Sequence, residues 1–168
     1  MSAGDVLVRR ATPDDAAAAA HVLNTVIAER RYTLFTQPFS IEEERRFIAS
    51  LDDRRALYLA EMPGGTVVGV QSVDLFVPFA ESMRHVATIG TWLLPEARGR
   101  GVARALSECS IRFARTAGYE KVVIQVLACN HRALGFYRAL GFTDIGVARR
   151  HVRLGDVLHD EIYLERLL

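Results

Sequence analysis

The sequence predicts an α/β (α+β) fold with a mixed, mostly antiparallel central sheet of about seven strands and helices on both faces. Two observations lead to this expectation. Strand-like apolar runs and helix-like amphipathic runs follow one another in the order β-α-α-β-β-β-α-β-α-β-β. This order contains both hairpins and β-α-β crossovers, which favours a mixed sheet. With 168 residues, half of them hydrophobic, the chain is expected to form one domain over residues 1–168.

The elements of the first half follow from capping and turn signals. Thr12-Pro13-Asp14-Asp15 and Ser40-Ile41-Glu42-Glu43 both have the pattern of a helix start with a capping box. Pro63-Gly64-Gly65 has the turn chemistry of a hairpin. The aromatic linker over residues 30–39 is expected to pack on the protein or on a ligand. The expected elements are strand 6–10, helix 12–28, helix 40–51 and strands 56–61 and 66–75.

The second half is predicted to contain two further helices among four strands. Apolar residues recur at helical spacing from Val102 to Phe113, and Gly118 is suited to end that helix. A nearly continuous apolar run over residues 121–127 is typical of a buried strand. Asn130 is a suitable cap for the last helix, and Gly141 is suited to close it. The expected elements are strand 85–94, helix 102–117, strand 121–127, helix 130–140 and strands 142–150 and 157–167.

Composition and charge argue against several classes of protein. A formal net charge of +1 gives no case for binding to nucleic acid, which a strongly basic balance would favour. No window approaches the roughly 18 apolar residues of a membrane span, so no membrane partner is expected. Residues 1–10 lack the basic and apolar segments of a secretory signal. A cytoplasmic location is therefore expected.

The cysteines and histidines do not suggest a disulfide framework or a metal site. Cys109 and Cys129 are too few for such a framework, and both are expected to be buried structural residues. The five histidines show no metal-ligand spacing, so no metal is expected. The basic run Arg149-Arg150-His151-x-Arg153 is expected to be a solvated hairpin face.

The most informative stretch runs from Leu93 to Ala103, where an apolar strand ends in a turn of arginines and glycines and a helix begins at once. Glycines let N–H groups turn inward, and a helix start carries unpaired N–H donors and partial positive charge, so a phosphate fits there. Arg104 occupies the third glycine position of the dinucleotide-binding fingerprint, and the Gly-Lys-Ser/Thr of nucleotide hydrolases is absent. A plain turn without a ligand stays an alternative.

Two motifs in this region resemble those of a known family. Arg98-x-x-Gly101-x-Ala103 is similar to the Arg/Gln-x-x-Gly-x-Gly/Ala motif of the GNAT superfamily of acyl-CoA-dependent N-acyltransferases. Asn130-x-x-Ala133-x-x-Phe136-Tyr137-x-x-Leu140-Gly141-Phe142 resembles the second motif of that family. One helix and one strand separate the two, and the element order is also that of the family. The resemblance implies a GNAT-like fold with the sheet splayed at the acetyl-CoA site.

The resemblance further implies an enzyme that moves an acetyl group from acetyl-CoA to an amine without a metal. In such an enzyme the turn would hold the pyrophosphate, and the side chains of Arg98 and Arg100 would add charge-assisted hydrogen bonds. The pantetheine would pair with the strand before the turn, through backbone groups of Leu93 and Leu94. The N–H groups expected to hold the pyrophosphate belong to Arg98, Gly99, Arg100, Gly101, Val102 and Ala103.

Tyr137 resembles the general acid of the family, which would protonate the CoA thiolate. The alternative is a core aromatic residue with a wet hydroxyl. Asn130 either hydrogen-bonds the pantetheine or caps its helix. A backbone N–H near Leu93 is the expected oxyanion donor.

The general base is not identified by the motifs. Some family members carry a glutamate in the strand before the turn, whereas residues 85–91 contain no carboxylate here. Glu29, Glu81 and His85 are candidates, and a water chain is an alternative.

The acceptor is expected to be a primary amine of a small or amino-acid-like molecule, bound between residues 29–39, residues 76–84 and the last hairpin. The tail and the first helix resemble a branch that includes herbicide-type amino-acid and ribosomal-protein acetyltransferases. A protein N-terminal amine is therefore a second option. A non-catalytic acyl-CoA-binding module is the alternative from another class, and a homodimer would follow by analogy with relatives.

Overall fold

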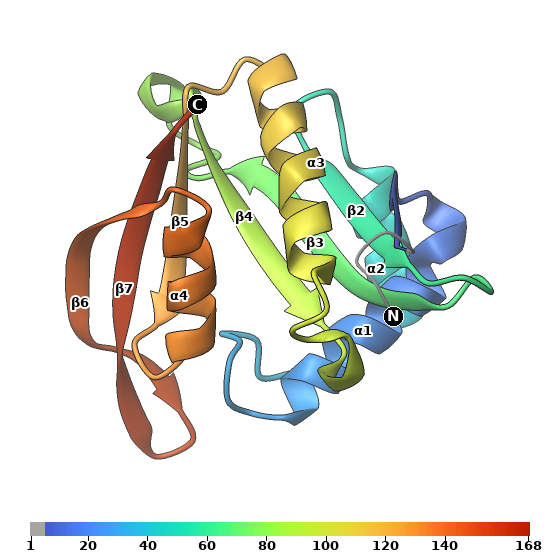
Figure 1. Cartoon of the computed structure of the whole chain (residues 1–168), viewed down its shortest axis with the longest axis horizontal. Coiled ribbons are helices and arrows are strands. Elements are labelled where there is room, and N and C mark those ends of the chain that lie inside the picture. Colours follow the sequence, from blue (N-terminus) through green and yellow to red (C-terminus); the bar gives the residue numbers. More distant parts are fainter. Residues whose placement is uncertain (1–5) are drawn as a thin grey trace.

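The structure is a computed structural model that describes residues 6–168. Its centre is a seven-stranded sheet with the strand order β1-β2-β3-β4-β5-β7-β6 (Figure 1). The strands are β1 (Leu7–Arg10), β2 (Ala56–Glu61), β3 (Val67–Leu75), β4 (Val86–Leu93), β5 (Lys121–Leu127), β6 (Thr143–Leu154) and β7 (Val157–Leu167). The helices are α1 (Ala16–Ala28), α2 (Ile41–Ala49), α3 (Val102–Thr116) and α4 (His131–Ala139).

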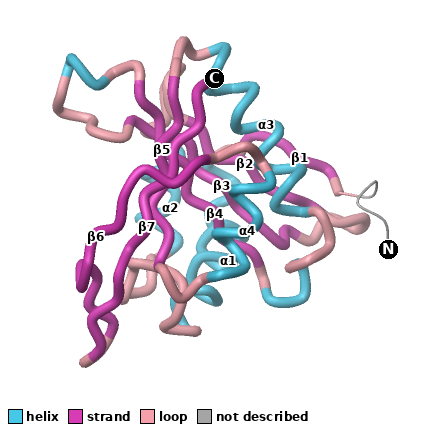
Figure 2. Tube along the Cα trace, turned by 60° about the vertical axis from the view of Figure 1, so that its left-hand side comes forward, coloured by secondary structure: helices cyan, strands magenta, loops and turns pink. Residues whose placement is uncertain are grey.

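The predicted fold class is confirmed. Every neighbouring pair of strands is antiparallel except β4 and β5, which run parallel. Helices α3 and α4 cover one face of the sheet, and α1 and α2 cover the other (Figure 1). The β6–β7 hairpin extends away from the helices as a twisted ribbon (Figure 2).

Local signals placed most elements within a few residues of their observed bounds. Strands β5 and β7 have the predicted limits. The first helix differs at its start, because Pro13–Asp15 forms a 3₁₀ turn before α1. The capping box at Ser40 is present, with the Ser40 N–H donating to the Glu43 carboxylate at 2.7 Å. None of the described helices is long and apolar enough to cross a membrane. The expectation about a secretory signal concerns residues 1–10, of which residues 1–5 lie outside the described part.

Strand β6 is longer than predicted and contains a bulge. Ala148 pairs with Glu161, and the next pair is Val152 with His159, so three residues of β6 lie opposite one residue of β7. Arg150 in this bulge has a left-handed φ of 52°, and its N–H donates to the Asp160 carboxylate at 2.7 Å. The hydrogen bond to Asp160 offsets the strain of this backbone conformation, and the strand continues past its predicted end at residue 150.

The prediction that both cysteines are buried was wrong. Cys129 is exposed and Cys109 is partly exposed, and both are free. Cys129 lies in the turn that follows β5, beyond the apolar strand that suggested burial. Cys109 lies on α3 and is not among the buried residues of that helix.

Candidate active site

Strands β4 and β5 separate soon after they begin. Within residues 6–168 they pair only at Val86–Lys121 and Ala87–Val122, and beyond these pairs they diverge toward the lower end of the sheet in Figure 1. On its other side β4 stays paired with β3 along its length, from Leu75–Ala87 to Gly69–Leu93. The sheet is therefore splayed, as the resemblance implied, and the space between the two strands is called the split below.

The backbone of β4 presents alternate residues to the split. The N–H of Leu94 donates to the Val68 carbonyl at 2.9 Å, so Leu94 faces β3. Because the hydrogen-bonding direction alternates along an antiparallel strand, the N–H and C=O groups of Thr91 and Leu93 face the split. The Leu94 carbonyl accepts from the Ala97 N–H at 3.0 Å, and its side chain is buried. The backbone groups of Leu94 are thus bonded to β3 and to the turn that follows, whereas Leu93 borders the split.

Tyr137 of α4 reaches across the split to β4. Its hydroxyl lies 2.7 Å from Oγ1 of Thr91, which also accepts a hydrogen bond from Nε2 of Gln71 at 2.7 Å. Tyr137 is 6% exposed, and its ring packs edge-on against Phe136 and Phe142. Burial raises the pKa of Tyr137, so the phenol keeps its proton at neutral pH.

The arginine- and glycine-rich turn lies at the open end of the split. A 3₁₀ turn over Pro95–Ala97 follows β4, and α3 begins at Val102. Gly99 and Gly101 have φ values of +76° and +82°, which residues with a side chain rarely adopt. The two glycines let the chain reverse directly into the helix, whose first N–H groups have no intrahelical partner.

The side chain of Arg98 is turned inward. Its guanidinium donates to the Leu93 carbonyl through Nη2 at 3.0 Å and Nε at 3.2 Å. It also donates to both carboxylate oxygens of Glu29, at 3.0 and 2.5 Å. Arg98 therefore ties the turn to the end of β4 and to the residue that follows α1. Any contact of this side chain with a phosphate would compete with these bonds.

Arg132 is a residue at the turn that the two sequence motifs do not indicate. A Cβ added to Gly99 would lie 2.5 Å from Nη2 of Arg132, so this guanidinium of α4 covers the turn from across the split. Its place two residues after Asn130, inside the second motif, was the available signal. Asn130 itself caps α4, with its Oδ1 accepting from the Ala133 N–H at 3.1 Å.

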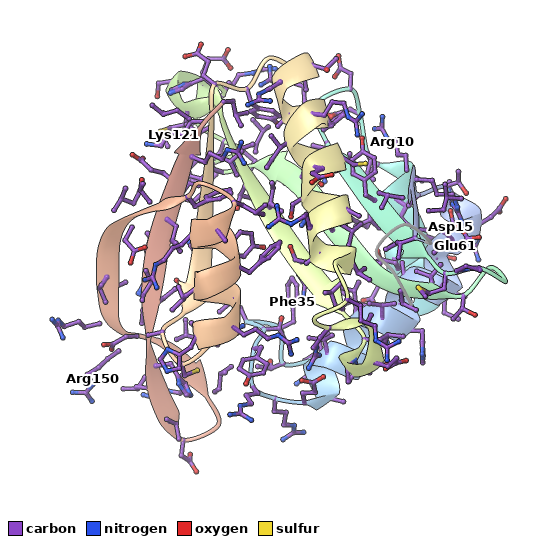
Figure 3. The ribbon with its side chains drawn as sticks, viewed as in Figure 1. Arg10, Asp15, Phe35, Glu61, Lys121 and Arg150 are labelled. Atoms are coloured by element: carbon purple, nitrogen blue, oxygen red, sulfur yellow. The ribbon has the colours of Figure 1, made fainter. Side chains whose placement is uncertain are left out.

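The linker between α1 and α2 lies at the open end of the split on the opposite face from Tyr137. Trp92 of β4 donates from Nε1 to Oγ1 of Thr33 at 3.4 Å, and Phe35 stacks on Trp92 with a centroid distance of 5.8 Å. Phe39 packs edge-on against Phe35. Figure 3 shows Phe35 in the opening beside β4. The expectation that this linker packs on the protein is confirmed, and 42% of Phe35 stays exposed.

Two expectations about the acceptor side were wrong. The loop of residues 76–84 and His85 lie at the closed end of the split, beside Lys121, and not near the linker (Figure 1, Figure 3). The His85 carbonyl accepts from the Glu120 N–H at 2.9 Å, and Glu81 pairs with Arg84 in the loop. Both lie near the start of β4, whereas Leu93 is at its end. Neither is near enough to Tyr137 to serve the same reaction.

Comparison with known proteins identifies the family. The model of the Acetyltransferase (GNAT) family matches residues 25–142. YwnH of Bacillus subtilis, which has the provisional name of a phosphinothricin acetyltransferase, is 25% identical over 140 residues, or 83% of this chain and 85% of YwnH. The N-alpha-acetyltransferase RimI of Mycobacterium tuberculosis is 33% identical over 97 residues, or 58% of each chain.

Solved structures share the fold. A ribosomal-protein-alanine N-acetyltransferase from Brucella melitensis has a TM-score of 0.90 at 24% identity, covering 96% of this chain and 99% of that one. A phosphinothricin acetyltransferase from Sinorhizobium meliloti, solved with AcCoA, has a TM-score of 0.90 at 21% identity, covering 98% and 89%. The chain belongs to the GNAT family, and it is an acetyltransferase that acts with acetyl-CoA.

Proposed function

We propose that this chain transfers the acetyl group of acetyl-CoA to the primary amine of a small or amino-acid-like molecule, with Tyr137 as the acid. The observation that carries the proposal is the Tyr137 hydroxyl, which Thr91 holds across the split at 2.7 Å. A buried phenol that keeps its proton at neutral pH has a proton to give to a thiolate formed beside it.

The proposed grip on acetyl-CoA uses mainly backbone groups. The N–H groups of residues 98–103 are proposed to hold the pyrophosphate, with Arg100 and Arg132 supplying positive charge at the turn. The N–H of Leu93 is proposed to bond the pantetheine or to receive the oxyanion. Leu94 is not retained in this role, because its own N–H and C=O groups are already bonded. Asn130 keeps its side-chain N–H₂ for a donor contact while its oxygen caps α4.

The acceptor proposal is supported by the linker and by the relatives. Thr33 and Phe35 contact Trp92, and Phe39 packs on Phe35, so the linker borders the open end of the split, which favours a small acceptor over a folded protein surface. The names of the relatives point to an amino-acid-like acceptor in one case and a protein N-terminus in another. A protein N-terminal amine is therefore the second candidate.

The test is the release of free thiol from acetyl-CoA with a panel of amines, including amino acids, phosphinothricin and a peptide that begins with alanine. Release with a small amine and not with the peptide is the expected result. Release with the peptide alone would favour the second candidate. Calorimetric binding of acetyl-CoA without release by any amine would indicate a non-catalytic binding module. Gly101→Glu is the binding control, since a side chain and a negative charge in the turn should abolish binding.

A further inference from the structure

The proposed reaction needs a base, because a primary amine with a pKa of about 10 is mostly protonated at neutral pH. The residues of β4 include no carboxylate. Glu29 holds Arg98 with both of its carboxylate oxygens, and Glu81 and His85 lie at the closed end of the split. None of these three side chains is therefore placed to act as the base, which leaves another side chain of the site or a water chain.

Glu161 lies on β7 at the level of the open end. It pairs with Leu127, the last residue of β5. Continuing the β4–β5 register beyond Ala87–Val122 brings Thr91 level with Val126, one residue before Leu127. Glu161 is thus at the same height along the sheet as the contact between Thr91 and Tyr137.

Glu161 also faces the acceptor side of the sheet. Directly opposed residues of two strands share a face, and the pair Val126–Ile162 belongs to the core that contains Tyr137. Side chains alternate along a strand, so Glu161 faces the other way. That is the face from which Trp92 contacts the linker. Glu161 and Trp92 therefore flank the open end of the split on one face of the sheet.

The Glu161 carboxylate is buried and has few polar partners among the described residues. The residue is 2% exposed, and no hydrogen bond joins its carboxylate to any part of residues 6–168. Its ionisable neighbour is His151 of β6, whose Nε2 lies 3.9 Å away. Two other pairs of polar groups on this face of β5 and β7 bond each other, Gln125 with Tyr163 and Lys121 with Glu165, and His159 lies on the same face two residues before Glu161. Burying a carboxylate without hydrogen bonds to offset its lost hydration lowers the stability of the fold. Such a group therefore points to a function.

We propose that Glu161 receives the ammonium group of the acceptor and takes one of its protons. This inference rests on the proposed function. The freed lone pair of the nitrogen forms the C–N bond to the thioester carbonyl carbon, and the C–S bond breaks. Tyr137 gives its proton to the departing sulfur and regains one from the nitrogen. Glu161 then releases its proton to solvent, so an ammonium ion and a thioester yield an amide, a thiol and one proton. Burial raises the pKa of Glu161 while His151 opposes the rise, which suits a base that works near neutral pH.

The experiment compares E161Q with the matched control E165Q, which changes a carboxylate two pairs further along the same face of β7. Steady-state thiol release is measured with an active amine from about pH 6 to pH 10, and acetyl-CoA binding is measured by calorimetry. E161Q should lower kcat/KM for the amine by about 100-fold at neutral pH with acetyl-CoA affinity unchanged, and E165Q should stay within about twofold of wild type. The E161Q deficit should shrink as pH approaches the amine pKa, because solution then supplies neutral amine.

Three outcomes contradict the inference. An E161Q enzyme as fast as wild type overturns it and leaves the proposed function in place. A deficit of equal size at every pH also overturns it, since that pattern indicates a structural or binding role. A wild-type enzyme that releases no thiol with any amine overturns the proposed function, and the role of Glu161 is lost with it. The E161Q substitution preserves the shape of the side chain. Circular dichroism verifies that the variant is folded.

Discussion

At the scale of the residue, the Tyr137 hydroxyl is the group on which the proposed chemistry depends. Tyr137→Phe removes one O–H and leaves the ring in its packing against Phe136 and Phe142. We expect kcat to fall by about 100-fold with little change in acetyl-CoA affinity. Unfolding should become easier by only about 1 kcal/mol, since Thr91 keeps its bond from Gln71. Unchanged turnover in a stopped-flow thiol assay would remove Tyr137 as the acid.

A second residue-scale prediction concerns the pair of Arg98 and Glu29. Both side chains are about one-quarter exposed, at 23% and 24%, so the pair is only partly shielded from water. Glu29→Gln should lower the free energy of unfolding by about 1 kcal/mol, and a double-mutant cycle with Arg98→Gln should give a coupling of similar size. Urea denaturation measures both quantities. Glu96→Gln, at an exposed position of the same turn, is the control and should change stability little. A coupling near zero would show that the pair does not hold the turn to α1.

At the scale of the element, α2 contains a buried acidic group that costs stability. Glu44 is 4% exposed, and its Oε1 has no hydrogen-bond partner within residues 6–168. Burial raises the pKa of Glu44, so the folded state binds a proton more tightly than the unfolded state. The stability that comes from keeping Glu44 protonated is therefore fully present below the unfolded carboxyl pKa of about 4.3. It is lost as pH rises from there through the raised pKa of the folded state.

Glu44→Gln should remove that pH-dependent loss. We expect the variant to be more stable than wild type by about 1 kcal/mol at pH 7 and to have no such advantage near pH 4. Thermal unfolding at the two pH values measures the difference. Glu42→Gln, an exposed position on the same helix, should show no comparable gain. A destabilised E44Q at pH 7 would indicate that the carboxylate has a stabilising partner in solution.

At the scale of the whole molecule, one ion cluster joins the edge of the sheet to the segment that leads into α1. The Arg9 guanidinium of β1 donates to Asp15 at 2.8 and 2.9 Å and to Glu61 of β2 at 2.9 Å. The side-chain hydrogen bonds from Arg9 hold the pKa of Asp15 well below its ordinary value. A depressed folded pKa means that the stabilisation is present above pH of about 4 and is lost as pH falls further.

Asp15→Asn should therefore lower the free energy of unfolding at neutral pH. It should also make that free energy fall less steeply as the pH is lowered. Arg9 is 36% exposed, so solvent screening limits the expected loss to about 1 kcal/mol at pH 7. Urea midpoints measured from pH 3 to pH 7 report the effect. Asp14→Asn, at an exposed neighbouring position, serves as the control. A variant whose stability falls with acid as steeply as wild type would contradict the assignment.

The amino-acid sequence by itself determined the class of fold, the order of the elements and the two motifs. These features depend on signals that act over a few residues. The capping box at Ser40 and the left-handed glycines Gly99 and Gly101 are examples. The turn could therefore be predicted as an anion site, and the resemblance to the family followed from the spacing of the two motifs.

Only the tertiary structure decided which side chains meet. The pair Leu127–Glu161 joins strands separated by a helix and another strand, and one step of register would turn Glu161 to the other face. The approach of Arg132 to Gly99 and the pairing of Arg98 with Glu29 likewise join distant segments. No local pattern specifies these contacts, because they depend on how the sheet twists and splits and on how the helices pack against it.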